Sequence, residues 1–265
     1  MLFAKSSAKT INSQVTNKVV LFPLGAIEQH GPHLSVSTDT DLVSNVAAGA
    51  ESKLPDDILL CPTLPFGSSH HHLSMGGTIS IAADTYSQVI VQMVESLLQN
   101  GFRRIVLLNG HGGNITPVRQ ALSLLSHTYD ASMHPNIVLA TYWELAAKYF
   151  TGAAPMESPA LSHACEYETS LMLHLCPEKV FPDEIKRAAR PLSNGYIPWE
   201  DDEPYSGVSI VKKTQFISNN GSSGEPQLGS AEKGSYLYSH AVEELVTFIG
   251  SFKTWPFLED LSKRK

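Results

Sequence analysis

The sequence has few of the residues that mark disulfide-stabilised or nucleic-acid-binding proteins. It contains three cysteines among 265 residues, an odd number without the spacing of a structural zinc motif. This argues against a disulfide framework and predicts a cytoplasmic protein. Lysine and arginine number 19 against 26 acidic residues, which gives a net charge of −7. Since no run of basic residues is present, DNA, RNA and anionic membrane surfaces are not expected partners.

Long hydrophobic runs are also absent. No stretch reaches the roughly 20 apolar residues that cross a bilayer, and the N-terminal segment lacks the apolar core of a secretory signal. With 42% hydrophobic and 17% charged residues, the composition is that of an ordinary globular protein. No shift in composition marks a boundary, so we expect one domain over residues 1–265.

Short apolar runs alternate with helical patterns along the chain. This alternation is typical of β-α-β units around a mainly parallel sheet. In the clearest helical pattern, Asp84 can cap the N-terminus and Gly101 ends the helix. Between residues 181 and 224 the periodicity fades, which predicts a long surface loop. The expected strands are residues 18–25, 58–67, 103–110 and 136–143, and the expected helices are 40–53, 83–99, 115–128, 165–175 and 231–252.

Polar motifs follow each of the predicted strands. They read GAIEQHGPH, GSSHHH, NGHGGN and YWE in chain order. In a parallel α/β sheet, ligands bind outside the carboxyl ends of the strands. We therefore expect these four motifs to converge on one edge of the sheet.

The first and third motifs have the residues of a metal site. Glu28 and His30 are two positions apart, so at an extended strand end both side chains point the same way. Asp39 follows a turn and precedes a helix, where it could return and bridge two ions. His111 lies between glycines that permit close approach. Imidazoles with carboxylates suit zinc or manganese, with iron(II) also acceptable, and two ions about 3.5–4 Å apart activate water for hydrolysis.

Each of these signals has a less specific interpretation when taken alone. A single loop histidine is most often a solvated polar residue. Adjacent histidines at 70–72 would face alternately on an extended segment, so we expect one functional histidine there. The cysteines are expected in the core and not as nucleophiles. Nucleotide binding by GHGGN is disfavoured because the motif lacks a lysine and the GxGxxG spacing.

Five motifs in order resemble the creatininase (creatinine amidohydrolase) family. They are PLGAIEQHGPHL...TD, FGSSHHHLSMGGTIS, LLNGHGGN, HACEYETSLML and GEPQLGSAEKG, and they extend over nearly the whole chain. The resemblance implies a three-layer α/β/α sandwich and a binuclear metal centre. It also implies hydrolysis of carbon–nitrogen bonds in small cyclic or other non-peptide amides, and a homo-oligomer.

The resemblance also assigns roles to individual residues. Asp39 corresponds to the bridging carboxylate, and His163 to a catalytic or substrate-orienting histidine. Glu168 corresponds to the glutamate of the ETS motif, also assigned here to catalysis, and His72 to the single histidine of GxSxxH. The ligand positions fall on residues already selected by spacing: Glu28, His30, Asp39 and His111.

One departure from the family concerns a ligand. Creatininase proper carries a carboxylate where this chain has Gly113, so the second ion would lose a ligand. Glu166 is the candidate replacement, because other branches of the family combine NGHGGN with a glutamate there. The alternative is that Glu166 is a first-turn acid favoured by the helix dipole. These branches include formamide hydrolases and a peptide-trimming enzyme of cofactor maturation, so the amide itself is left open.

A mechanism and a pocket follow from this assignment. A metal-bridging hydroxide is expected to attack the amide carbon while His163 protonates the leaving nitrogen. Trp143 is a candidate pocket wall. The loop at 187–207, which includes Trp199, either closes over the site as a lid or packs as an ordinary surface or oligomer contact. A degenerate family member that binds metal without catalysis is the competing hypothesis.

Overall fold

The computed structural model describes residues 1–128, 135–188, 213–257 and 261. Its centre is a sheet of four parallel strands in the order β2-β1-β3-β4. The strands are β1 (Val19–Leu24), β2 (Ile58–Leu60), β3 (Arg104–Asn109) and β4 (Asn136–Thr141). All four expected strands are therefore present, and a parallel sheet brings their carboxyl ends to one edge.

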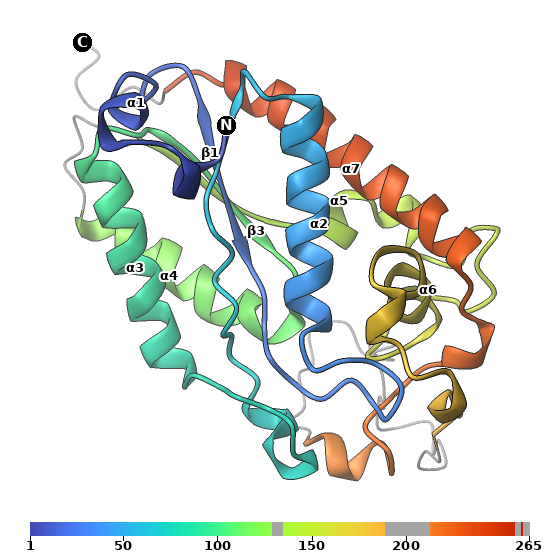
Figure 1. Ribbon diagram of the computed structural model, residues 1–265. Coiled ribbons are helices and arrows are strands. Elements are labelled where there is room, and N and C mark those ends of the chain that lie inside the picture. The colour runs from blue at the N-terminus through green and yellow to red at the C-terminus, as the bar shows by residue number, and fades with distance from the viewer. Residues whose placement is uncertain (129–134, 189–212, 258–260, 262–265) are drawn as a thin grey trace.

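Helices cover both faces of this sheet (Figure 1). One face carries α2 (Thr38–Lys53), α6 (Glu166–Leu175) and α7 (Ala231–Thr254). The other carries α3 (Ala83–Gln99) and α4 (Ile115–Thr128), with the short α1 (Ala8–Asn12) beside them. The predicted three-layer α/β/α sandwich is confirmed, whereas the single domain stays a prediction.

The alternation of side chains along β1 produces these layers. Val19 and Leu21 belong to the core beneath α2 and α7, whereas Val20, Phe22 and Leu24 belong to the core beneath α3 and α4. Successive side chains of a strand point to opposite faces. A strand apolar at every position is therefore buried on both sides, as parallel strands are.

Two predicted strands are shorter than expected. Proline has no amide hydrogen, and β2 ends at Leu60 just before Pro62. The chain then runs on to Leu64, whose amide donates to the carbonyl of Pro23. The strand expected over 136–143 ends at Thr141, where the helix α5 (Tyr142–Leu145) begins and buries Tyr142.

The capping role predicted for Asp84 is wrong. Ala82 is the N-cap of α3 and offers no side-chain bond, while Asp84 accepts from the amide of Thr85 inside the first turn.

The predicted lid at 187–207, with Trp199, lies outside the described residues from position 189 onward. Short 3-10 helices connect the larger elements: Phe3–Lys5, His70–Met75, Gly112–Asn114, Ala147–Tyr149, Pro177–Lys179, Pro182–Glu184, Thr214–Phe216 and Pro226–Leu228.

The three cysteines are unpaired and buried, as expected for core residues. In the described part of the chain, every helix is too short or too polar to cross a bilayer.

Candidate metal centre

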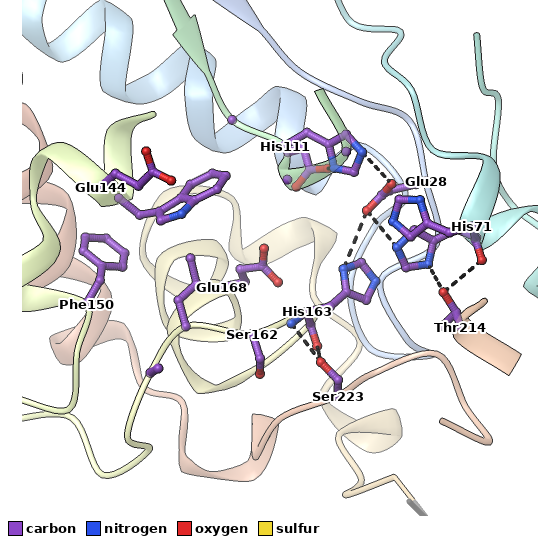
Figure 2. Close-up of a pocket in the computed structure, with 18 of the residues that line it drawn as sticks. Glu28, His71, His111, Glu144, Phe150, Ser162, His163, Glu168, Thr214 and Ser223 are labelled. Atoms are coloured by element: carbon purple, nitrogen blue, oxygen red, sulfur yellow. Dashed lines mark hydrogen bonds and ion pairs between the residues drawn. The ribbon is translucent and has the colours of Figure 1, made fainter. Parts of the chain in front are cut away.

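Polar side chains gather at the carboxyl edge of the sheet (Figure 2). Glu28 and His30 follow β1, and His111 follows β3. Asp39 occupies the first turn of α2, where the helix dipole favours a negative charge. Glu168 stands in the first turn of α6. Four different parts of the fold therefore supply this site.

Asp39 lies between two histidines. Its Oδ1 is 3.2 Å from Nε2 of His30, and its Oδ2 is 3.0 Å from Nδ1 of His111. Burial would raise the pKa of Asp39, but the charge of His30 and the close approach of both imidazoles outweigh burial and hold the pKa well below its usual range. The carboxylate thus stays ionised with each oxygen turned to a different imidazole.

Glu28 is the carboxylate that the remaining histidines share. Its Oε2 lies 3.3 Å from Nε2 of His111, and its Oε1 lies 3.4 Å from Nε2 of His72 and 3.6 Å from Nδ1 of His163. Burial is the main cause that raises the pKa of Glu28 to about 7, although the charge of His111 acts in the opposite direction. In a metal-free protein, protons therefore compete for this carboxylate near neutral pH.

Several atoms of this cluster are buried without a hydrogen bond. They are Oε2 of Glu28, Nε2 of His30 and Oδ2 of Asp39. Buried polar atoms are nearly always paired, so three buried atoms without a hydrogen bond at one place indicate a position for a cation. His30 donates from Nδ1 to the carbonyl of Glu28, which leaves Nε2 facing the cluster, the orientation of a ligating histidine. The residues present therefore fit divalent metal ions.

Glu168 completes the end of the cluster near His30. Its Oε1 lies 3.9 Å from Nε2 of His30, and its Oε2 accepts a hydrogen bond from the amide of Ala164. Ala164 has a positive φ of 49°, which L-residues rarely adopt. That bond holds the turn between His163 and Glu168 and directs both side chains to the site. Burial raises the pKa of Glu168 to about 7.

A hydrogen-bond network orients two further histidines. The side-chain amide of Gln29 donates to Nδ1 of His72 at 2.7 Å and to the carbonyl of Gly221 at 3.1 Å. Nε2 of His163 donates to the backbone carbonyl of Gln29 at 2.8 Å. This pattern leaves Nε2 of His72 and Nδ1 of His163 facing Glu28. Gln29 thus sets the orientation of both rings.

A cavity of about 600 Å³ opens beside the cluster (Figure 2). Glu28, Asp39, His111, His163 and Glu168 line its polar side. The predicted pocket residues His72 and Trp143 also line it. The apolar side is formed by Trp143, Phe150, Leu161 and Ile217.

Glu166, the predicted substitute ligand, has a carboxylate that is turned away from the cluster. Its buried carboxylate accepts from Lys233 Nζ at 2.6 Å and from the amides of Glu157 and Ser158 at 3.0 and 2.6 Å. Burial would raise the pKa of Glu166, but the bond from Lys233 outweighs it and lowers the pKa. Two positions on a helix differ by roughly 200°, so Glu168 faces the cluster and Glu166 faces α7. Glu166 therefore joins α6 to α7.

The histidine tract also differs from expectation. Residues His70–Met75 form a 3-10 helix and not an extended segment. As a result both His71 and His72 line the cavity, while His70 is exposed and bonded to Ser80. Side chains alternate between two sides only along an extended strand. In the 3-10 helix they do not, so the sequence did not predict that His71 lines the cavity.

Comparison with known proteins identifies the family. The profile of the creatininase (creatinine amidohydrolase) family matches residues 4–249. The chain belongs to the creatininase family. The mycofactocin precursor peptide peptidase of Mycobacterium tuberculosis is 28% identical over 259 residues, covering 94% of this chain and 92% of that protein. The creatinine amidohydrolase of Pseudomonas putida is 28% identical over 181 residues, covering 63% and 68%.

Solved structures bear out the fold. A creatininase variant described as Zn-Zn type superposes with a TM-score of 0.79 at 22% identity, covering 96% of this chain and 98% of that one. The expectations of a creatininase-like α/β fold and of a family hydrolase that acts on carbon–nitrogen bonds are confirmed at this level. The sequence analysis did not predict that Gln29 orients His72 and His163. The only hint in the sequence was its position between the candidate ligands Glu28 and His30.

Proposed function

We propose that the protein hydrolyses an amide carbon–nitrogen bond of a small molecule at a centre for two divalent ions. Glu28 and His111 would hold one ion, His30 and Glu168 the other, and Asp39 would lie between them. The observation that carries this proposal is the division of the two Asp39 oxygens between His30 and His111, within a cluster whose buried ligand atoms lack partners.

The ligand chemistry supports zinc or manganese, with iron(II) also acceptable. Imidazole suits zinc and iron, and carboxylates suit manganese, so a mixed set accommodates each of them. When bound, such ions polarise a carbonyl and lower the pKa of water. Glu168, and not Glu166, would supply the carboxylate ligand from α6, because Glu168 faces His30 whereas Glu166 is bonded to Lys233.

His163 is the proposed proton carrier. Burial, and next the charge of His30, hold its pKa well below the usual range, so the ring is neutral. Nε2 is committed to the carbonyl of Gln29, which leaves Nδ1 to accept a proton beside Glu28 and deliver it to the leaving nitrogen. The His163 side chain is 20% exposed and lines the cavity, so substrate can reach it.

The cavity supports an amide with an apolar portion. Its volume of about 600 Å³ lies within the usual range for sites that take drug-sized molecules. Trp143 and Phe150 offer aromatic surfaces to such a portion. A formamide of a cofactor pathway or a small cyclic amide fits this description.

A peptide-derived substrate is the second candidate. The peptidase relative matches over 92% of its length, against 68% for the creatinine amidohydrolase. A peptide end with an apolar side chain would place its amide at the cluster and its side chain against Trp143.

A substrate screen with metal-loaded protein tests this function. Small cyclic amides, N-formyl compounds and short peptides are incubated with zinc- or manganese-loaded protein, and Asp39→Asn serves as the matched inactive control. We expect hydrolysis of one class by the wild type alone. A protein that binds no ions and cleaves none of them would be a non-catalytic scaffold and would overturn the proposal.

A cytoplasmic homo-oligomer is proposed as the working form. Three unpaired cysteines suit a reducing compartment. Within the described residues, β4 is a half-buried edge strand of the sheet, and Trp255 and Phe257 beyond α7 are each 41% exposed. Exposed aromatic surface beside an open edge favours association. Light scattering of the purified protein measures the mass, and a monomer at all concentrations would contradict association.

A further inference from the structure

His71 lies beside two residues of the proposed metal centre. One potential ligand atom from each of Glu28, His71 and His111 lies within 4.8 Å of the others. The rings of His71 and His111 are nearly parallel, with centroids 6.0 Å apart and an interplanar angle of 7°. Both residues line the cavity (Figure 2). His71 is therefore positioned to reach an ion held by the other two.

Gly113 creates the space that His71 borders. A Cβ at this position would overlap the carbonyl oxygen of Ser68 and Nε2 of His111, and would stand 3.1 Å from Cε1 of His71. A side chain at 113 thus conflicts with this arrangement. The neighbouring Gly112 faces open space, with nothing within 4 Å of an added Cβ. The conflict is therefore specific to Gly113.

A buried acceptor points into the same place. Oε2 of Glu28 is buried without a hydrogen bond, although His111 is close. The main chain of His71 is fixed by a hydrogen bond from Thr214 Oγ1 to its carbonyl at 3.1 Å. Its ring contacts the rings of His72 and His111 and has no hydrogen bond among the described residues. A ligand atom is thus available on a fixed backbone.

We propose that His71 is a further ligand of the ion held by Glu28 and His111, in the coordination position that Gly113 cannot fill. This inference rests on the proposed metal-dependent function. With the shared Asp39, this position has two imidazoles and two carboxylates, and the second imidazole favours zinc over manganese. The position formed by His30, Asp39 and Glu168 has one imidazole and two carboxylates, so it tolerates manganese better. The two positions are therefore expected to differ in metal preference.

Zinc content and affinity test the assignment. Wild type, His71→Ala and His70→Ala are loaded with zinc, dialysed against a chelator of known affinity and analysed for zinc per chain. His70→Ala is the matched control, because His70 is exposed and bonded to Ser80. We expect one of the two ions in His71→Ala to bind more than about 10-fold more weakly, with the other unchanged, and His70→Ala to behave as wild type.

Two further measurements separate ligation from misfolding. X-ray absorption at the zinc edge should show fewer imidazoles per zinc in His71→Ala, and His71→Glu should shift occupancy towards manganese. Unchanged affinity and imidazole number in His71→Ala would overturn the assignment of His71 alone. A wild type that binds no zinc, with a normal melting temperature, would overturn the metal centre itself.

Discussion

Asp39 meets His111 at 3.0 Å through Oδ2 while its other oxygen is turned to His30. A carboxylate with its two oxygens committed to two different ligands has the geometry of a bridge. In the proposed centre, placing this one residue would hold two ions at a fixed separation. The first turn of α2 performs that placement.

Asp39→Asn should remove this bridge. The amide offers one acceptor oxygen in place of two, so both ions lose a shared ligand. We expect metal binding to weaken by more than the roughly 100-fold caused by loss of a residue that only orients a ligand. Asp41→Asn on the same helix is the control, because Asp41 pairs with Lys179. Elemental analysis that finds two ions in Asp39→Asn would contradict the bridge.

Glu168→Gln and Glu166→Gln should separate binding from stability. Glu168→Gln is expected to lose an ion because its oxygen faces His30. Glu166→Gln should keep both ions but reduce the free energy of unfolding by about 1–3 kcal/mol, since Lys233 and two backbone amides lose a charged acceptor. Denaturant unfolding and metal analysis are measured on both variants. Loss of metal in Glu166→Gln alone would reverse the assignment.

Gln29→Leu should impair turnover without removing metal. The leucine cannot donate to His72 or to the carbonyl of Gly221, so the ring of His72 loses its fixed orientation, whereas the backbone carbonyl of residue 29 still holds His163. We expect kcat to fall roughly 10- to 100-fold with unchanged metal content. Because the Gln29 side chain acts through His72, which lies 3.4 Å from Glu28, the pH profile of kcat should also shift. A lower kcat with an unaltered profile would indicate a purely structural role.

Metal-free protein should lose stability as pH rises above about 6.5. The pKa of His30 is raised to about 10 and that of His111 to about 9: burial lowers both, but Asp39 for His30 and Glu28 for His111 outweigh it. A histidine whose pKa is higher when folded stabilises the protein fully below its unfolded value of 6.5, and this stability is lost as pH passes through 9–10. Ions replace these protons, so zinc should raise the melting temperature increasingly from pH 6.5 to 9. A constant difference between zinc-loaded and chelator-treated samples would refute this linkage.

Gly113→Ala should disturb the site whereas Gly112→Ala should not. The added methyl group at 113 would overlap the Ser68 carbonyl and His111, whereas at 112 it meets open space. We expect Gly113→Ala to weaken zinc binding about 10-fold or more, with Gly112→Ala at the wild-type value. Calorimetric titration of each variant with zinc measures the difference, and equal affinities would show that the loop relaxes without cost.

The parallel sheet and the convergence of Glu28, His30 and His111 could be predicted from local rules. Period-two alternation placed Glu28 and His30 on one side of a strand end, and the parallel-sheet rule brought His111 to the same edge. These rules depend on sequence neighbours alone. The position of Glu168 relative to Glu166 depends on which helix face meets α7, and the deciding contact, Lys233, lies far along the chain. No local pattern carries that information.

Short-range backbone geometry explains the other differences. His71 was missed because the tract after Ser69 curls into a 3-10 turn, which needs no marker such as proline or glycine inside it. The early end of β2 could be read from Pro62, whose missing amide breaks the ladder. Asp84 was predicted as the cap of α3, but the N-cap is Ala82, two residues earlier, which has no polar side chain.

The hydrogen bond from Gln29 to Gly221 joins positions 192 residues apart. Closing a contact of such separation costs the entropy of a long loop, which slows folding. A growing chain that ends after β4 would carry Glu28, Asp39 and His111 but neither His163 nor Glu168. The ion proposed for Glu28, His71 and His111 would find its ligands in such a chain, whereas the ion proposed for His30 and Glu168 would not. The second ion would therefore stabilise only the finished fold, by mass action.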